Sequence, residues 1–157
     1  MKEAEKNICR ILVVSRMTKD CQKAFHMGAS LARQNSAELY LMHVVHNPFG
    51  IEGWNLPLPS LEKDFRKLLE KSREELDELV AAEKAEGLQV IELLREGDPV
   101  DEVVAVVKEY EIDLVVMLAH EEGRLEHFLF GRSNNELVRR LPCSILLVKK
   151  EPGPIDW

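Results

Sequence analysis

The sequence of 157 residues has few cysteines, no excess of positive charge and no long apolar run. Its three cysteines, Cys9, Cys21 and Cys143, are an odd number without metal-type spacing, so we expect reduced structural thiols. No apolar stretch approaches the roughly 20 residues that a membrane helix needs. The start MKEAEKNICR lacks the apolar core of a secretory signal. We therefore expect a cytoplasmic protein with no membrane partner.

Acidic residues outnumber basic ones, 28 to 21, which gives a formal net charge of -7. Binding to a phosphate backbone needs a basic face, so we expect no nucleic-acid partner. The acidic excess is concentrated between Leu61 and Glu111, where acidic residues are twice as numerous as basic ones. The solvated faces of two helices would produce such an excess. The segment from Leu118 to Lys150 is mildly basic instead.

Strand-like and helix-like segments alternate along the chain. Short apolar runs rich in β-branched residues predict buried strands at 8–15, 37–46, 88–96, 113–119 and 143–150. Helical spacing of apolar residues predicts helices at 18–35, 60–87, 97–110 and 134–141. This order predicts a single α/β domain over 1–157, with a core of about 7–150 and a loose tail at 151–157. Its parallel sheet should carry helices on both faces.

Local signals mark the starts of the predicted helices. Asp98 is suited to cap a helix with Pro99 at its first position and Asp101 in its first turn. Thr18 and Ser60 are the predicted caps of the first and second helices. The predicted core stripes consist of Ala24, Met27, Gly28 and Leu31 in the first helix, Phe65, Leu68, Leu69, Leu76, Leu79 and Val80 in the second, and Val100, Val103, Val104 and Val107 in the third.

Three segments, taken in order, resemble the universal stress protein (UspA-like) family across almost the whole chain: ILVVSRMTKDCQKAFHMGASLARQNSAELYLMHVV, EGDPVDEVVAVVKEYEIDLVVM and GRSNNELVRRLPCSILLVKK. The resemblance implies an adenine-nucleotide alpha hydrolase-like, Rossmann-like fold with an open five-stranded sheet in the order 3-2-1-4-5. It also implies a homodimer that pairs or packs through the last strand, at Ile145, Leu146, Leu147 and Val148. Ligands bind such a sheet where the strand order reverses, so 15–18 and 118–133 should share a crevice.

Family members that bind ATP carry the motif G-x-x-G-x9-G-(S/T) after strand four and an Asp after strand one. The glycines let backbone N–H groups approach the phosphates, and the following helix N-terminus adds partial positive charge. In this sequence the glycine positions hold Leu118, Glu121 and Gly131, the Ser/Thr position holds Arg132, and the Asp position holds Arg16. The resemblance therefore implies a degenerate ATP-binding motif.

The charge at Glu121 can be weighed against phosphate binding. Two unit charges about 4 Å apart, at an effective dielectric of about 20, interact by about 4 kcal/mol. Repulsion of that size corresponds to roughly three decades of affinity. Arg16, Arg132 and Arg124 could neutralise the local carboxylates or attract a different anion. The candidate nucleotide- or anion-binding residues are Val14, Arg16, Val44, Met117, Leu118, Gly131, Arg132 and Ser133.

Several of these residues have a structural alternative. Ser133 and Glu136 fit a capping box, which would occupy the serine hydroxyl with its own helix. Gly131 either holds a phosphate or supplies a positive φ before the helix. Arg16 and Arg132 either bind an anion or pair with nearby carboxylates. The loop 47–59, which contains Phe49 and Trp54, is either a partner-binding or dimer-packing surface or a lid over the second helix.

Metal and catalytic sites receive less support from the sequence. His43 and His46 are three residues apart on one strand and therefore point to opposite faces. A zinc site would need the loop residues His120, Glu121, Glu122 and His127 to gather. Neither a P-loop nor a nucleophile elbow is present, and Cys143 has no evident base beside it. We predict no catalytic residue and no metal.

The sequence thus supports three hypotheses about function. The first is a homodimeric universal stress protein that regulates or protects through contacts with an unknown protein partner, without strong ATP binding, a cofactor or a chemical step. The second is a sensor of ATP, another adenine nucleotide or a small anion, which uses the crevice after strands one and four. A slow phosphohydrolase is the third, and it is the least supported because neither a general base nor a metal site is placed.

Overall fold

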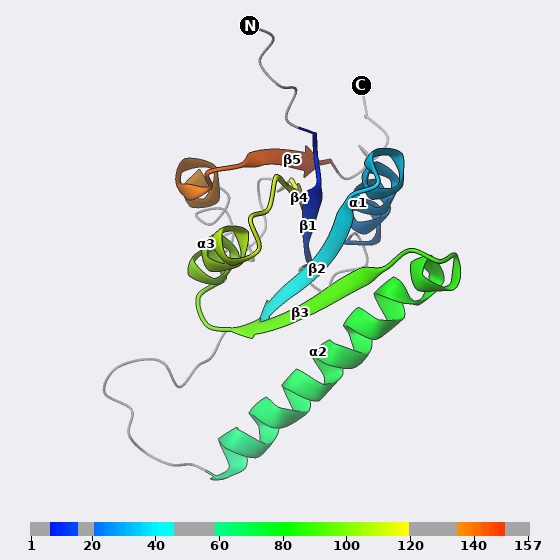
Figure 1. Ribbon diagram of the computed structural model, residues 1–157. Coiled ribbons are helices and arrows are strands. Elements are labelled where there is room, and N and C mark those ends of the chain that lie inside the picture. The colour runs from blue at the N-terminus through cyan, green and yellow to red at the C-terminus, as the bar shows by residue number, and fades with distance from the viewer. Residues whose placement is uncertain (1–6, 16–20, 46–58, 120–134, 150–157) are drawn as a thin grey trace, which may run out of the picture.

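The computed structural model describes residues 7–15, 21–45, 59–119 and 135–149. Its centre is one parallel sheet of five strands in the order β3-β2-β1-β4-β5 (Figure 1), as predicted. Each strand begins one or two residues later than the sequence pattern predicted, which is the usual uncertainty of such boundaries. The strands are β1 (Arg10–Ser15), β2 (Glu38–Val45), β3 (Val90–Glu96), β4 (Leu114–Leu118) and β5 (Ser144–Val148).

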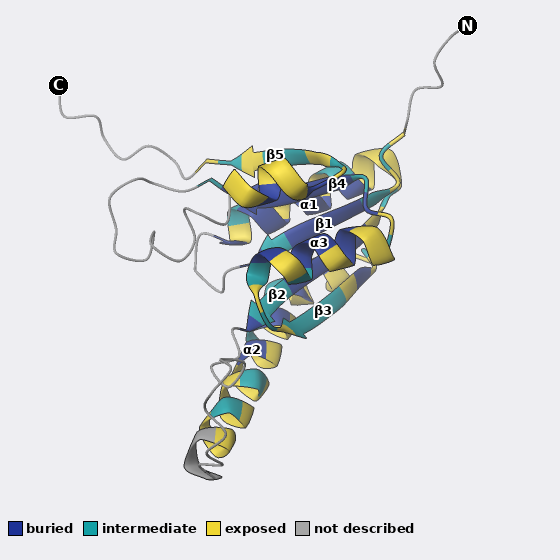
Figure 2. Ribbon diagram, turned by 90° about the vertical axis from the view of Figure 1, so that its left-hand side faces the viewer, coloured by how far each residue is buried: buried dark blue, intermediate teal, exposed yellow. Residues whose placement is uncertain are grey.

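Helices cover both faces of this sheet (Figure 2). The helices are α1 (Cys21–Asn35), α2 (Pro59–Ala85), α3 (Pro99–Glu109) and a short helical segment at 135–140. Alternation along β1 sends Ile11 and Val13 toward α1 and α2, and Leu12 toward α3. All five residues of β4 are buried, as expected of a central strand that is covered on both faces. None of the helices in the described ranges is long and apolar enough to cross a membrane.

The start of α3 is fixed by its own residues. The Asp98 carboxylate accepts hydrogen bonds from the backbone N–H groups of Val100 and Asp101, at 3.0 and 3.1 Å. Pro99 occupies the first helical position, where its missing N–H costs nothing. The predicted cap is therefore confirmed. All four valines of the predicted core stripe are buried in the cluster between α3 and the sheet.

The start and packing of α2 differ from the prediction. The helix begins at Pro59, so Ser60 lies inside it instead of capping it. Leu68, which was predicted to face the core, is 47% exposed. A helix of 27 residues spans about 40 Å, whereas the eight residues of β2 span only about 26 Å. The first half of α2 therefore extends beyond the sheet, as Figure 2 shows.

The predictions for α1, namely its core stripe and its cap, have mixed outcomes. Ala24 and Gly28 of α1 are buried, but Met27 is 43% exposed, because it lies at the edge of the stripe that faces the sheet. A Cβ added at Gly28 would overlap the Cγ2 atom of Val13, so this glycine allows α1 to pack closely on β1. Thr18, the predicted cap of α1, lies outside the described residues.

A buried carboxylate links α1 to α2. Glu83 is only 6% exposed and ion-pairs with the guanidinium of Arg33. Its other oxygen lies 3.1 Å from Nδ1 of His26. Arg33 also reaches Glu86, at 3.0 Å. These contacts hold the C-terminal half of α2 against α1 on one face of the sheet.

Candidate functional site

The strand order reverses between β1 and β4, so the carboxyl ends of these two strands form the topological switch point. Val13 pairs with Val116, which places Val14 level with Met117. Val44 lies on the neighbouring strand β2, two residues beyond the partner of Val14. All three side chains belong to the α3 side of the sheet. The structure thus brings three predicted site residues together on one face as an apolar patch.

Leu118 occupies the first glycine position of the family motif, and it faces the other way. Its side chain is 8% exposed and lies in the core cluster on the α1 side, together with Val116 and Leu146. The backbone N–H of the next residue, Ala119, donates to the carbonyl of Val148 at 2.8 Å. The side chain is therefore separated by the sheet from the patch that Val14, Val44 and Met117 form.

The remaining candidate residues, including all the charged ones, lie outside the described residues. This applies to the motif positions, the predicted zinc ligands and the aromatic residues of the 47–59 loop, namely Arg16, His46, Phe49, Trp54, His120, Glu121, Glu122, Arg124, His127, Gly131, Arg132 and Ser133. Of the described candidates, Val14 and Val44 are half-buried, and Met117 is only 2% exposed. Apolar side chains can line one side of a ligand site, whereas a charged ligand also needs hydrogen-bond donors.

His43 makes a contact at this end of the sheet that sequence reasoning missed. Its Nδ1–H donates to the carbonyl of Ser15 at 3.0 Å. Burial lowers the pKa of His43, although the hydrogen bond to Ser15 and the charge of Glu75 oppose this. The ring therefore carries its proton on Nδ1 and ties the last residue of β1 to β2. Residues 15 and 43 are register partners, a fact that the sequence alone does not contain.

No metal centre emerges from the part of the chain that the structure describes. It contains no group of three or more His, Cys, Asp or Glu side chains arranged to hold an ion. The described residue of the proposed capping box, Glu136, pairs with Arg140 at 3.2 Å. Arg140 also bonds Asp101 at 2.8 Å, so it links the 135–140 helix to α3.

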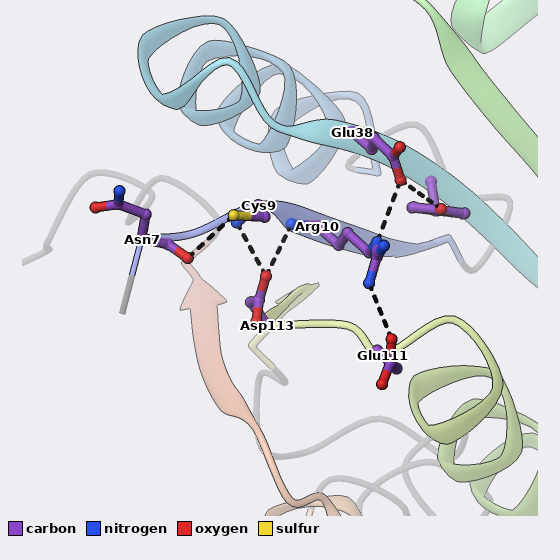
Figure 3. Close-up of polar contacts among 7 residues, drawn as sticks. Asn7, Cys9, Arg10, Glu38, Glu111 and Asp113 are labelled. Carbon is purple, nitrogen blue, oxygen red and sulfur yellow. Dashed lines mark hydrogen bonds and ion pairs between the residues drawn. The ribbon is translucent and has the colours of Figure 1, made fainter. Parts of the chain in front are cut away.

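A second polar cluster lies at the opposite, amino-terminal end of the strands (Figure 3). The Oδ2 atom of Asp113 accepts hydrogen bonds from the backbone N–H groups of Cys9 and Arg10, at 2.9 and 3.0 Å. Arg10 in turn lies 3.3 Å from both Glu38 and Glu111. These contacts join the starts of β1, β2 and β4. Because ligands bind such sheets at the other end, this cluster is structural.

The predicted dimer residues lie on β5, whose one strand partner within the described ranges is β4. Leu147 is 44% exposed, although it is a large apolar side chain. Ile145, Leu146 and Val148 are partly buried, on alternate faces of the sheet. An open strand edge with an exposed leucine is suited to pairing with another chain.

A parallel sheet in the order 3-2-1-4-5 with helices on both faces defines a Rossmann-like α/β fold, and it is the fold of the solved UspA structure. Residues 8–149 match the model of the universal stress protein family. The chain belongs to this family.

Individual relatives agree with this assignment. The universal stress protein MJ0531 of Methanocaldococcus jannaschii is 29% identical over 126 residues, which cover 77% of this chain and 70% of the relative. The structure of UspA from Lactobacillus plantarum has a TM-score of 0.71 at 19% identity and covers 90% of this chain and 98% of the other.

Two further structural neighbours contain a nucleotide. A universal stress protein in complex with cAMP has a TM-score of 0.61 at 20% identity, with 89% of this chain and 95% of the other covered. The universal stress protein from Archaeoglobus fulgidus in complex with dAMP has a TM-score of 0.62 at 17% identity, with coverage of 90% and 98%. At these identities the likeness is one of fold.

Proposed function

We propose that this universal stress protein is a cytoplasmic homodimer that regulates or protects through protein contacts, without strong ATP binding and without a chemical step of its own. The observation that carries the proposal is Leu118 at the first glycine position of the motif. Its side chain is part of the core on the α1 side, so this position carries a packing side chain where the motif has a glycine. Glu121 and Arg132 at two further motif positions agree with this interpretation.

Nucleotide content is the direct test of this proposal. The purified protein is denatured, any released nucleotide is identified by chromatography, and ATP, ADP and AMP are titrated with magnesium while the melting temperature is followed. A ligand at one hundred times its Kd adds about 2.7 kcal/mol of stability, which for a chain of this length raises Tm by roughly 5–11 °C. We expect no ATP in the sample and no such shift with ATP. Stoichiometric ATP would overturn the proposal.

The homodimer can be tested on the β5 edge. Light scattering should give about twice the monomer mass of 18.0 kDa at micromolar concentration. Leu147→Glu should shift the protein to the monomer, because a charge would enter an apolar contact. Val138→Glu is the matched control, since Val138 is 55% exposed and lies on the 135–140 helix. A wild-type monomer would contradict the dimer.

A second candidate function is a sensor for an adenine nucleotide or a small anion. The apolar patch of Val14, Val44 and Met117 favours it, because a base could stack there. Structural neighbours in complex with cAMP and dAMP show that this fold can bind adenine nucleotides with a single phosphate. Binding of cAMP or AMP that survives the double change Arg16→Ala, Arg132→Ala would exclude these arginines as the anion ligands.

A further inference from the structure

The two faces of β5 differ in the helices that lie near them. The 135–140 helix lies on the same side of the sheet as α3 (Figure 1), and its Leu137 is buried in the cluster that Ile145 joins. On the other side, α1 packs mainly on β1 and β4, and α2 packs on β2 and β3. Leu146 and Val148 point to this side and are half-buried. In the described ranges, the α1 side of β5 thus has no helix of its own.

One flank of α1 continues this apolar surface. Arg33 contacts Glu83 of α2, so its flank of α1 faces β2 and β3. Leu31 lies two residues before Arg33, which on an α-helix places the two side chains about 160° apart. Leu31 and Met27, which is one turn earlier, therefore face the β5 side, and Met27 is 43% exposed. The apolar shelf that results consists of Met27, Leu31, Leu146 and Val148.

The outer edge of β5 determines where a second copy would continue this shelf. The N–H of Ala119 donates to the carbonyl of Val148 at 2.8 Å, so the backbone groups of residue 148 face β4. Because these groups alternate along a strand, those of Ile145 and Leu147 face outward. In the homodimer proposed above, they would pair with the same groups of the second copy in antiparallel orientation. The two-fold axis of such a pair is perpendicular to the sheet, so both α1 helices lie on the same face.

The distance between the two α1 helices of that dimer follows from the strand order. The helix packs on both β1 and β4, so its axis lies between these strands. About four strand spacings of roughly 4.8 Å then separate the two α1 axes, which gives about 19 Å. Helices that pack directly on one another lie only about 8–10 Å apart. The gap between the two α1 helices is therefore wide enough for one additional helix.

We propose that the homodimer binds one amphipathic helix of a partner protein on its two-fold axis, between the two α1 helices and on the apolar shelves of both copies. The inference rests on the proposed function, because it needs the dimer and describes the contact through which a module without a chemical step acts. Every residue of the shelf is apolar, so the partner helix should present an apolar face. The symmetric groove holds one helix for every two chains.

Isothermal titration calorimetry with the full-length protein and two peptides tests this proposal. The first peptide has about 18 residues, with leucines at helical spacing on one face and Gln and Ala elsewhere. The second has the same composition, but its leucines are spread around the helix. We expect the first peptide to bind at a ratio of one peptide to two chains, at least about tenfold more tightly than the second. A ratio of one to one, equal affinities or no binding would overturn the proposal.

Variants of the shelf and of the dimer edge test the two halves of the groove. Met27→Glu should weaken binding of the first peptide by about tenfold or more, because a charge enters the groove from each copy. Gln22→Glu is the matched control, since Gln22 is exposed on α1 and lies about 140° around the helix from Met27. Unchanged peptide binding by Met27→Glu would exclude the shelf.

Leu147→Glu should abolish peptide binding, because each monomer would present only half of the groove. The side chain of Leu147 alternates with that of Leu146 and points to the opposite face of the sheet, so it is not part of the shelf. Binding of one peptide to each Leu147→Glu monomer, with the wild-type affinity, would overturn the proposal.

Light scattering on the same samples separates the outcomes. A wild-type dimer that binds neither peptide would overturn this inference and leave the proposed homodimer standing. A wild-type monomer would contradict the homodimer, and this inference with it. Dissociation of the dimer by Met27→Glu alone would show that the second copy itself occupies the shelf, which overturns the binding of a partner helix.

Discussion

Replacing Glu83 by glutamine should destabilise the protein at neutral pH by an amount that can be worked out from its contacts. Hydrogen bonds to charged groups contribute about 1.5–3 kcal/mol each. Glu83 ion-pairs with Arg33 and lies beside His26, but these partner side chains are 39% and 63% exposed, so solvent screens both interactions. Glutamine also keeps one acceptor oxygen. We therefore expect a loss of about 1.5 kcal/mol, or a decrease in Tm of about 3–6 °C.

The stability difference between Glu83→Gln and the wild type should depend on pH. Burial disfavours the ionised Glu83, yet the hydrogen bonds from Arg33 and His26 outweigh burial and lower its pKa below the ordinary value. A carboxylate with a lowered folded-state pKa stabilises the protein above its unfolded pKa, and this contribution disappears as the pH falls through the folded value. The difference in Tm between Glu83→Gln and the wild type should thus be full at pH 7 and shrink as the pH falls below the ordinary glutamate pKa of about 4.3.

Thermal melts followed by circular dichroism at several pH values provide the measurement. Glu86→Gln is the control, because Glu86 also reaches Arg33 but its side chain is 72% exposed. We expect that control to change stability by less than about 0.5 kcal/mol. A Glu83→Gln deficit of the same size at acidic and neutral pH would refute the assignment of the effect to the ionised carboxylate.

Three further substitutions test the packing and the strand ends. Gly28→Ala should cost about 1–3 kcal/mol in urea unfolding, because its Cβ would overlap Val13, and a variant as stable as the wild type would disprove the close packing of α1 on β1. Asp98→Ala should cost about 1 kcal/mol through the lost cap, and unchanged hydrogen exchange in the first turn of α3 would contradict this. Asp113→Asn should lower stability by about 1–2 kcal/mol, since its charged oxygen accepts two backbone N–H groups; an unchanged urea midpoint would count against that role.

The parts of the fold that the sequence predicted best are those where local chemistry decides. The apolar run of β4 has no polar face to turn to water, so it had to become a strand that is covered on both sides. Asp98 as the cap and Pro99 as the first helical residue together specify where α3 begins. The order of the strands came from the family resemblance, and the structure confirms it.

The wrong predictions concern features that depend on contacts with distant parts of the chain. The periodicity of α2 shows which side of the helix is apolar, but it does not show how far the sheet beneath it extends. Leu68 fits the stripe and is nevertheless exposed, because the strands are too short to cover the whole helix. Among residues 62–85 of α2, whose burial is described, the buried positions begin at Ser72 and include Leu76 and Val80.

The candidate site was predictable in one respect and hidden in another. Val14 and Val44 were named from the family resemblance, and the structure places both on one face of the sheet. The contact between His43 and Ser15 depends on which residues of β1 and β2 are partners. That register is set by turns and by the packing of both strands, and no local pattern encodes it.

The polar cluster around Asp113 affects how freely the rest of the chain can change. It pins β1, β2 and β4 to one another at their amino ends, whereas ligands approach the carboxyl ends. The residues that align the strands thus lie at the opposite end of the strands from the candidate ligand site. A library that randomises the half-buried Val14 and Val44 and keeps the buried Met117 should therefore contain many members that still fold. Such a library would make this chain a practical starting scaffold for selecting new ligand specificities.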